Sequence, residues 1–172
     1  MAQVPKILHQ VTLFQDLDAE ALSALARLLT AKKLNAGNVV FEELEDSDAL
    51  YIVEAGCVVV SKHVRDDVDI VLTRFRPGDF FGEMGLFDAA PRSATAHAES
   101  DSVIWRLDRG VFHDVLAHRP EIAAKICYRL VTVFIERLRA TNEQAREAVR
   151  WGLEATGYAP SGGGSLFGRK ST

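Results

Sequence analysis

The distribution of apolar and polar residues changes twice along the chain. Between residues 18 and 33 the leucines recur at spacings of three and four, which places them on one face of an α-helix with Asp18 in the N-cap position. From Asn38 to Leu107, apolar runs alternate with turn-forming segments such as NAGN and RPGD. In this stretch we expect β-strands at residues 39–43, 49–64, 68–75, 93–100 and 102–107.

The strand-rich region contains no segment long enough for a crossover helix. We therefore expect its strands to pair in an antiparallel manner, as in a jelly roll or barrel. Gly37, Gly56 and Gly78 fall at the corners of this region, where a positive φ or close packing favours glycine. The pattern predicts a mainly β fold that is preceded by one helix.

Two more helices are expected after the strands. A short one at residues 109–118 follows Asp108, which suits an N-cap, and Pro120 then opens a long helix that reaches about residue 151. The apolar residues of the long helix form a stripe that packs either against the strands or against a second copy of the helix in a homodimer. The stripe consists of Ala123, Cys127, Leu130, Phe134, Leu138, Thr141, Ala145 and Ala148.

Composition narrows the class of protein. The 172 residues suffice for one domain, which we place at residues 1–152, and the glycine- and serine-rich residues 153–172 predict a flexible tail. The formal net charge of -4 gives no electrostatic reason to bind nucleic acid, and about twenty glycine- and serine-rich residues after the long helix are too few to form a DNA-reading domain, so we expect no nucleic-acid partner. No apolar run is long enough to span a membrane and no signal peptide is evident, so we expect a cytoplasmic protein.

One segment carries the candidate chemistry: FFGEMGLFDAAPRSATA, residues 80–96. It sets Glu83 and Arg92 among small and apolar residues, where a charged group needs a partner. Gly82 and Gly85 let an anion approach the backbone of a short helical turn, and the planar guanidinium of Arg92 suits a phosphate. The Glu83 carboxylate fits beside a phosphate only if it accepts a hydrogen bond from the same ligand. A ribose 2′-hydroxyl next to a single phosphate meets both demands, so the segment indicates a cyclic nucleoside monophosphate.

The segments RPGDFFGEMGLF and PRSATA resemble the phosphate-binding cassette of the cyclic nucleotide-binding domain family, and the resemblance extends over about Val11 to Thr141. It implies an eight-stranded antiparallel jelly roll, or β-roll, with an N-terminal helix and a long C-terminal helix. It also implies that Glu83 binds the ribose 2′-hydroxyl, and that Arg92 and Ser93 bind the cyclic phosphate. One departure is the turn at residues 42–48, which lacks the glycine that many members carry. The implied binding residues of the cassette are Phe81, Gly82, Glu83, Met84, Gly85, Leu86, Arg92, Ser93, Ala94 and Thr95.

The base end of such a ligand falls on the long helix. In the family this helix closes over the base, and RLRATNEQ resembles the segment that a bacterial member uses for adenine, which implies Thr141 and Asn142. Counting along the helix without gaps places Arg137 and Leu138 at that point instead. We take Arg137, Thr141 and Asn142 as base-binding candidates and expect cyclic AMP to be favoured over cyclic GMP.

Two alternatives stay open. In a ligand-free domain of the same fold, Glu83 and Arg92 would form a salt bridge, and the domain would serve as an interaction or dimerisation module. A cupin-like metalloenzyme is the rival for this class of fold, but the five histidines show no metal-ligand spacing. Ser93 has no positioned histidine to activate it. We therefore expect a sensor that is not an enzyme, binds no metal and acts through an unknown effector protein.

Overall fold

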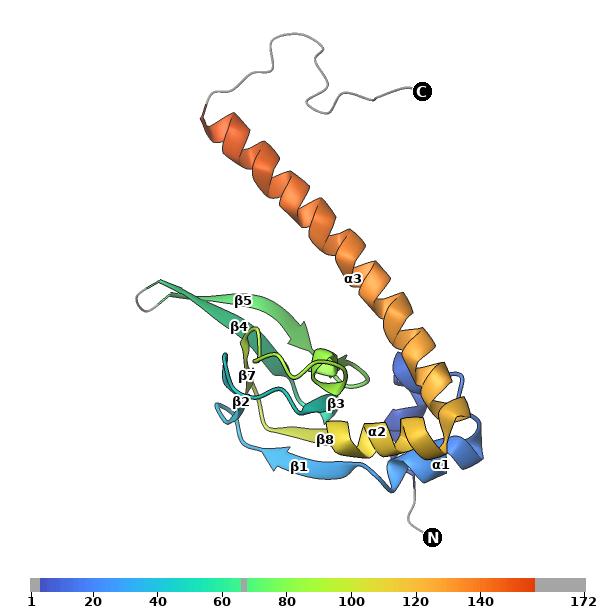
Figure 1. Cartoon of the computed structure of the whole chain (residues 1–172). Coiled ribbons are helices and arrows are strands. Elements are labelled where there is room, and N and C mark those ends of the chain that lie inside the picture. Colours follow the sequence, from blue (N-terminus) through green and yellow to red (C-terminus); the bar gives the residue numbers. More distant parts are fainter. Residues whose placement is uncertain (1–3, 66–67, 157–172) are drawn as a thin grey trace, which may run out of the picture. The chain divides into compact units, whose positions relative to one another are not determined.

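The computed structural model describes residues 4–65 and 68–156. In this part of the chain, eight strands form two four-stranded antiparallel sheets (Figure 1). The strands are β1 (Thr30–Leu34), β2 (Val39–Phe41), β3 (Ala49–Ala55), β4 (Val58–Arg65), β5 (Val68–Phe75), β6 (Phe80–Phe81), β7 (Thr95–Ala98) and β8 (Ser102–Asp108). Their order is β1-β8-β3-β6 in one sheet and β2-β7-β4-β5 in the other. The expected antiparallel, mainly β class is confirmed.

Helical segments flank the strands at both ends of the described chain. Asp18 caps the first α-helix as predicted, because its carboxylate accepts a hydrogen bond of 2.8 Å from the Ala21 N–H. Asp108 precedes the second α-helix, but its side chain makes no capping hydrogen bond and pairs with Arg106 instead. The helices are η1 (Lys6–His9), η2 (Thr12–Phe14), α1 (Ala19–Ala26), η3 (Glu83–Leu86), α2 (Arg109–His118) and α3 (Pro120–Ala155).

The core between the sheets follows from the alternation of side chains along the strands. In β3, Ala49, Tyr51 and Val53 belong to one buried cluster that draws residues from both sheets. Leu50 and Ile52 point to the opposite face by the same alternation, and they too are completely buried. Packing on both faces of β3 therefore holds this strand, and with it the position of its ends. The cassette pairs with this strand through β6.

The prediction of one helix over residues 18–33 was wrong at its C-terminal end. The structure ends α1 at Ala26 and starts β1 at Thr30, which pairs with Arg106 of β8. Ladder hydrogen bonds to a neighbouring strand therefore outweigh the local helical spacing of the leucines. The predicted strand at residues 49–64 is two strands, because Gly56 turns the chain with a φ of 84°.

The chain divides into two compact units, Met1–Leu130 and Val131–Thr172, so that α3 begins in the first and continues in the second. In the first unit α3 buries four residues, Ile122, Ala123, Ile126 and Leu130. Most of the tail predicted at residues 153–172 lies outside the described residues, and the boundary at residue 152 stays a prediction. No helix in the described part of the chain has the length and apolar character needed to cross a membrane.

Candidate functional site

The cassette begins where β6 ends, and two glycines shape its first turn. Gly82 takes the left-handed conformation with a φ of 73°, and η3 starts at the next residue. A Cβ atom at Gly82 would lie 2.9 Å from Nη1 of Arg92 and 3.1 Å from the Ala49 carbonyl oxygen. A Cβ atom at Gly85 would lie 2.5 Å from the Ser47 hydroxyl oxygen. Both positions therefore need glycine so that neighbouring polar groups can approach the backbone.

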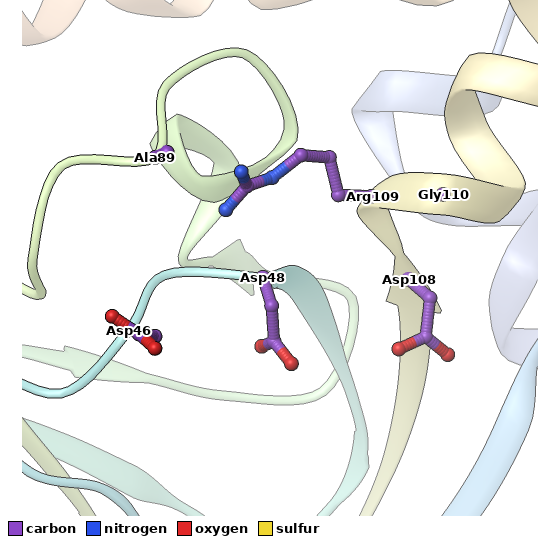
Figure 2. Close-up of a pocket in the computed structure, with 6 residues that line it drawn as sticks. All are labelled: Asp46, Asp48, Ala89, Asp108, Arg109 and Gly110. Atoms are coloured by element: carbon purple, nitrogen blue, oxygen red, sulfur yellow. The ribbon is translucent and has the colours of Figure 1, made fainter.

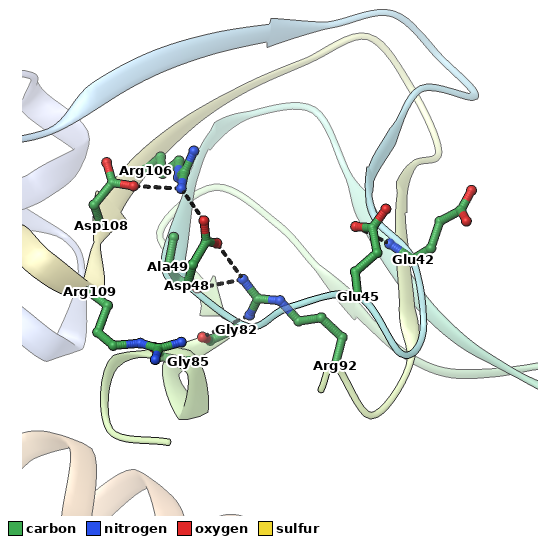
Figure 3. Close-up of polar contacts among 10 residues, drawn as sticks. All are labelled: Glu42, Glu45, Asp48, Ala49, Gly82, Gly85, Arg92, Arg106, Asp108 and Arg109. Carbon is green, nitrogen blue, oxygen red and sulfur yellow. Dashed lines mark hydrogen bonds and ion pairs between the residues drawn. The ribbon is translucent and has the colours of Figure 1, made fainter. Parts of the chain in front are cut away.

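Arg92 is the buried cation of this site, with 5% of its surface exposed. Its Nη1 donates to the Gly82 carbonyl at 3.2 Å, and its Nη2 donates to the Ala49 carbonyl at 3.0 Å. Nη2 also lies 3.5 Å from the Asp48 carboxylate (Figure 3). The guanidinium carbon stands 4.1 Å from the centre of the Phe41 ring. These contacts place a positive charge at the edge of the core.

That positive charge is only partly compensated by its surroundings. The Nε of Arg92 is buried and has no hydrogen-bond partner within residues 4–65 and 68–156. Burial lowers the pKa of the Arg92 guanidinium, and the nearby Tyr51 and Asp48 oppose that change. An anion beside this guanidinium would therefore be stabilised more strongly than one at an exposed arginine.

A chain of ion pairs extends from Arg92 to the start of α2 (Figure 3). Asp48 accepts a hydrogen bond of 2.7 Å from Nη2 of Arg106, and Arg106 also pairs with Asp108. Arg109, the first residue of α2, donates from Nε to a carbonyl of η3 at 2.7 Å. The cassette is thus tied by charged side chains to the helix that precedes α3.

The backbone of Arg92 is also held on both sides. The Leu44 N–H donates to the Arg92 carbonyl at 2.9 Å, and the Arg92 N–H donates to the Glu45 carbonyl at 2.8 Å. Leu44 reaches this position with a φ of 72°, in the left-handed region, and its side chain is largely exposed. This is the turn that lacks the expected glycine. Leu44 adopts there the backbone conformation that glycine favours.

The structure brings the predicted cassette residues together around η3 and the start of β7. Glu83 is buried at 6% exposure, whereas Met84 and Ser93 are exposed. The Thr95 hydroxyl accepts a hydrogen bond of 3.0 Å from the Glu43 N–H, which links the end of the cassette to the turn at residues 42–48. The buried apolar members of the predicted set are Phe81, Leu86 and Ala94.

The base-binding candidates lie elsewhere, on the part of α3 that belongs to the second unit. Thr141 and Asn142 are exposed, and Arg137 is half-buried. Their contact with a base remains a prediction.

Four residues of the site could not be found by the motif. Phe41 at the end of β2 and Asp48 just before β3 contact Arg92. Arg106 of β8 binds Asp48, and Arg109 of α2 binds the Gly85 carbonyl of the cassette. The only signal in the sequence was the acidic turn at residues 42–48, which suggested an unusual backbone but no partner for Arg92.

A cavity of about 450 Å³ opens beside the ion pairs (Figure 2). Its lining includes three carboxylates, from Asp46, Asp48 and Asp108, together with Arg109. In the described part of the chain, no group of three histidine, cysteine or acidic side chains is arranged to hold a metal ion. Two of the three carboxylates are engaged by Arg106, so the cavity borders the network that supports Arg92.

The model of the cyclic nucleotide-binding domain family matches residues 31–119. The chain belongs to the cyclic nucleotide-binding domain family. It is 32% identical over 144 residues to the CRP-like cAMP-activated global transcriptional regulator of Mycobacterium tuberculosis, covering 84% of this chain and 62% of that protein. The chain therefore spans less than two thirds of the length of this relative.

Two solved structures of similar proteins agree with the fold. The N-terminal domain of a transcriptional regulator from Streptomyces coelicolor has a TM-score of 0.69 at 30% identity, covering 81% of this chain and 95% of that chain. The regulatory domain of Toxoplasma gondii PKA, solved with cAMP, has a TM-score of 0.59 at 35% identity, covering 65% of this chain and 42% of that chain. These similar proteins thus include regulators of transcription and the regulatory domain of PKA.

Proposed function

We propose that this chain is a cytoplasmic sensor that binds one 3′,5′-cyclic nucleotide in its cassette, favours cyclic AMP over cyclic GMP, and acts through a partner protein. The observation that carries the proposal is the surroundings of Arg92. A buried guanidinium with an unpartnered Nε lies next to a glycine turn whose lack of side chains lets polar groups approach its backbone closely. A singly charged phosphate diester supplies the anion that such a group needs.

The phosphate end of the ligand would lie between Arg92 and the turn at Gly82. The Nη atoms of Arg92 now bond to two backbone carbonyls, which carry only partial negative charge. A phosphate oxygen forms a shorter and stronger charge-assisted hydrogen bond with a guanidinium than a neutral carbonyl does. The exposed hydroxyl of Ser93 would add a donor beside it.

The sugar end would be set by Glu83, a carboxylate that the fold buries at 6% exposure in the first turn of η3. A ribose 2′-hydroxyl donates to such a carboxylate, which offsets part of the cost of burying it. This contact would distinguish a ribonucleotide from a 2′-deoxyribonucleotide, and it would not depend on the base.

The preference for cyclic AMP is supported by the relatives. The mycobacterial regulator is activated by cAMP, and the Toxoplasma domain was solved with cAMP. The base itself would be contacted by Arg137, Thr141 and Asn142 when α3 closes over it. Both relatives are regulators, so a regulatory role through a partner protein is the corresponding proposal for this chain.

Isothermal titration with cyclic AMP and cyclic GMP tests the proposed function. We expect one site per chain, tighter binding of cyclic AMP, and stabilisation against unfolding by about 2.7 kcal/mol at a hundredfold excess over the dissociation constant. No heat and no thermal stabilisation with either nucleotide at millimolar concentration would show that the cassette is not a ligand site.

A second candidate function is an interaction or dimerisation module of the same fold. It is favoured by an exposed apolar stripe on α3, in which Val131, Ile135, Leu138 and Val149 have 45–63% of their surface exposed. The first three residues recur at spacings of four and three, which suits a two-helix contact with a second copy. Sedimentation equilibrium at two protein concentrations, with and without cyclic AMP, distinguishes a dimer from a monomer and shows whether the nucleotide changes it.

A further inference from the structure

Lys62 lies on the outer side of the segment that carries Arg92 and Ser93. Its Nζ donates to the Ser93 carbonyl at 3.2 Å and lies 3.0 Å from the Glu43 carboxylate. The Lys62 side chain is half exposed, and that of Glu43 is 24% exposed. Lys62 directly follows the last β4 residue that pairs with β7, so it stands where the cassette segment leaves the sheet.

The same segment is held at three further points by the turn that follows β2. The Arg92 backbone bonds in both directions with Leu44 and Glu45, and the Thr95 hydroxyl accepts from the Glu43 N–H. Ser93 lies between these points, and Lys62 holds its carbonyl. The ion pair with Glu43 then connects Lys62 back to the same turn, which closes the set of contacts into a ring.

The hydrogen bond to Ser93 fixes the orientation of one peptide unit. A peptide bond is planar and trans, so the N–H of Ala94 points away from the side on which the Ser93 carbonyl meets Lys62. The direction of that carbonyl therefore sets the direction of the N–H that follows Ser93. It also restricts the backbone from which the Ser93 hydroxyl projects.

We propose that Lys62 is a positioning residue for the phosphate end of the nucleotide site. Its ammonium orients the Ser93–Ala94 peptide unit, and its positive charge, reduced by Glu43, adds to the attraction that Arg92 exerts on an anion. This inference rests on the proposed function and adds a residue that the cassette motif does not contain.

The test compares four variants of the full chain by titration with cyclic AMP: Lys62→Met, Lys62→Arg, Glu43→Gln and, as a matched control, Lys32→Met. Lys32 is an exposed lysine of β1 in the other sheet. We expect Lys62→Met to weaken binding about tenfold, because a hydrogen bond from a charged donor is lost at a half-exposed site. Lys62→Arg should restore binding to within about twofold, since it keeps both the donor and the charge. The control should bind as the wild type does.

Glu43→Gln separates the charge of Lys62 from its bracing contact. The variant keeps the backbone N–H that binds Thr95 but no longer neutralises Lys62. We expect its affinity to equal or exceed that of the wild type, by up to about twofold. A Glu43→Gln variant that binds as weakly as Lys62→Met would show that Lys62 acts only when Glu43 holds it in place, and it would overturn the proposed contribution of the Lys62 charge to anion attraction.

Two readouts exclude a general loss of structure. The melting temperature of Lys62→Met should stay close to that of the wild type, because the side chain is half exposed. The ratio of affinities for cyclic AMP and its 2′-deoxy analogue should stay unchanged, because Lys62 acts at the phosphate end. If the wild type binds cyclic AMP and Lys62→Met binds it with the same affinity, this inference alone is overturned. If the wild type binds no cyclic nucleotide, the proposed function and this inference are overturned together.

Discussion

Arg92 and Thr141 are assigned to the two ends of one ligand, yet their surroundings differ. Arg92 lies in the first compact unit, where it is held by the carbonyls of Gly82 and Ala49 and by the carboxylate of Asp48. Thr141 is an exposed residue of α3 in the second unit. The proposed phosphate end is thus held by tertiary contacts within one unit, whereas the proposed base end is on the exposed surface of a helix.

This difference assigns separate tasks to the two regions. Affinity common to all cyclic nucleotides should come from the phosphate end, because its donors and glycines are already in place. Discrimination between bases should come from α3, and it should carry the cost of fixing the helix over the ligand. Substitutions at the two ends should therefore change different measured quantities.

Arg92→Ala should have the largest effect, because it removes the cation from the phosphate end. A lost charge-assisted hydrogen bond and a phosphate left without its partner predict a loss of affinity of roughly a hundredfold or more, equal for cyclic AMP and cyclic GMP. Titration calorimetry measures both constants. Arg92→Lys is the matched control, and it should fall between the wild type and Arg92→Ala because it keeps the charge without the planar fork. A loss confined to one of the two nucleotides would contradict the division of tasks.

Glu83→Ala should change the response to the sugar. The wild type should bind cyclic AMP about tenfold more tightly than its 2′-deoxy analogue, because the buried carboxylate would otherwise lack that donor. The variant should bind both ligands about equally, and more weakly than the wild type binds cyclic AMP. Competition with a fluorescent cyclic nucleotide gives the four constants. A wild type that does not distinguish the two ligands would assign Glu83 a structural role only.

Thr141→Ala should change the choice of base. We expect the ratio of affinities for cyclic AMP and cyclic GMP to shift by about fivefold, which corresponds to one neutral hydrogen bond. Gln144→Ala, one helical turn away on the same helix, is the control and should leave the ratio unchanged. If Thr141→Ala leaves the ratio of the two affinities unchanged while Asn142→Ala or Arg137→Ala changes it, the base contact belongs to the residue whose substitution changes the ratio.

Local patterns in the sequence predicted the antiparallel class of the fold, which the structure confirms, and the residues of the cassette, whose binding role stays a prediction. Gly82, Glu83 and Arg92 lie within one short segment whose spacing is set by a turn and a strand start. The partners of Arg92 could not be predicted in the same way. Phe41 and Asp48 are more than forty residues away from it in the sequence, and only the strand pairing brings them close.

The same distinction explains the error at the end of α1. Leucines at helical spacing extend to residue 29. Thr30 and the residues after it nevertheless pair with β8, a strand that comes about seventy residues later in the sequence. The spacing of apolar residues within one segment does not indicate which distant strand that segment pairs with. The turn at residues 42–48 gave a partial signal, since the absence of glycine was visible, but the residue that would take the positive φ was not.

Leu44→Gly should give the smallest effect and the only gain in stability. Leu44 has a φ of 72°, and a leucine in this region costs roughly 1 kcal/mol that a glycine avoids. The greater freedom of glycine in the unfolded chain offsets part of this, so we expect an increase of about 0.5 kcal/mol in the free energy of unfolding. Urea unfolding measures this free energy.

Leu44→Ala is the matched control, because it removes the exposed side chain but keeps the Cβ atom, and it should show no gain in stability. Since the bonds between this turn and Arg92 are made by the backbone, nucleotide affinity should stay within about twofold in both variants. Equal stability of the glycine and alanine variants would mean that Leu44 carries no backbone strain, and that the turn holds Arg92 without an energetic cost at this residue.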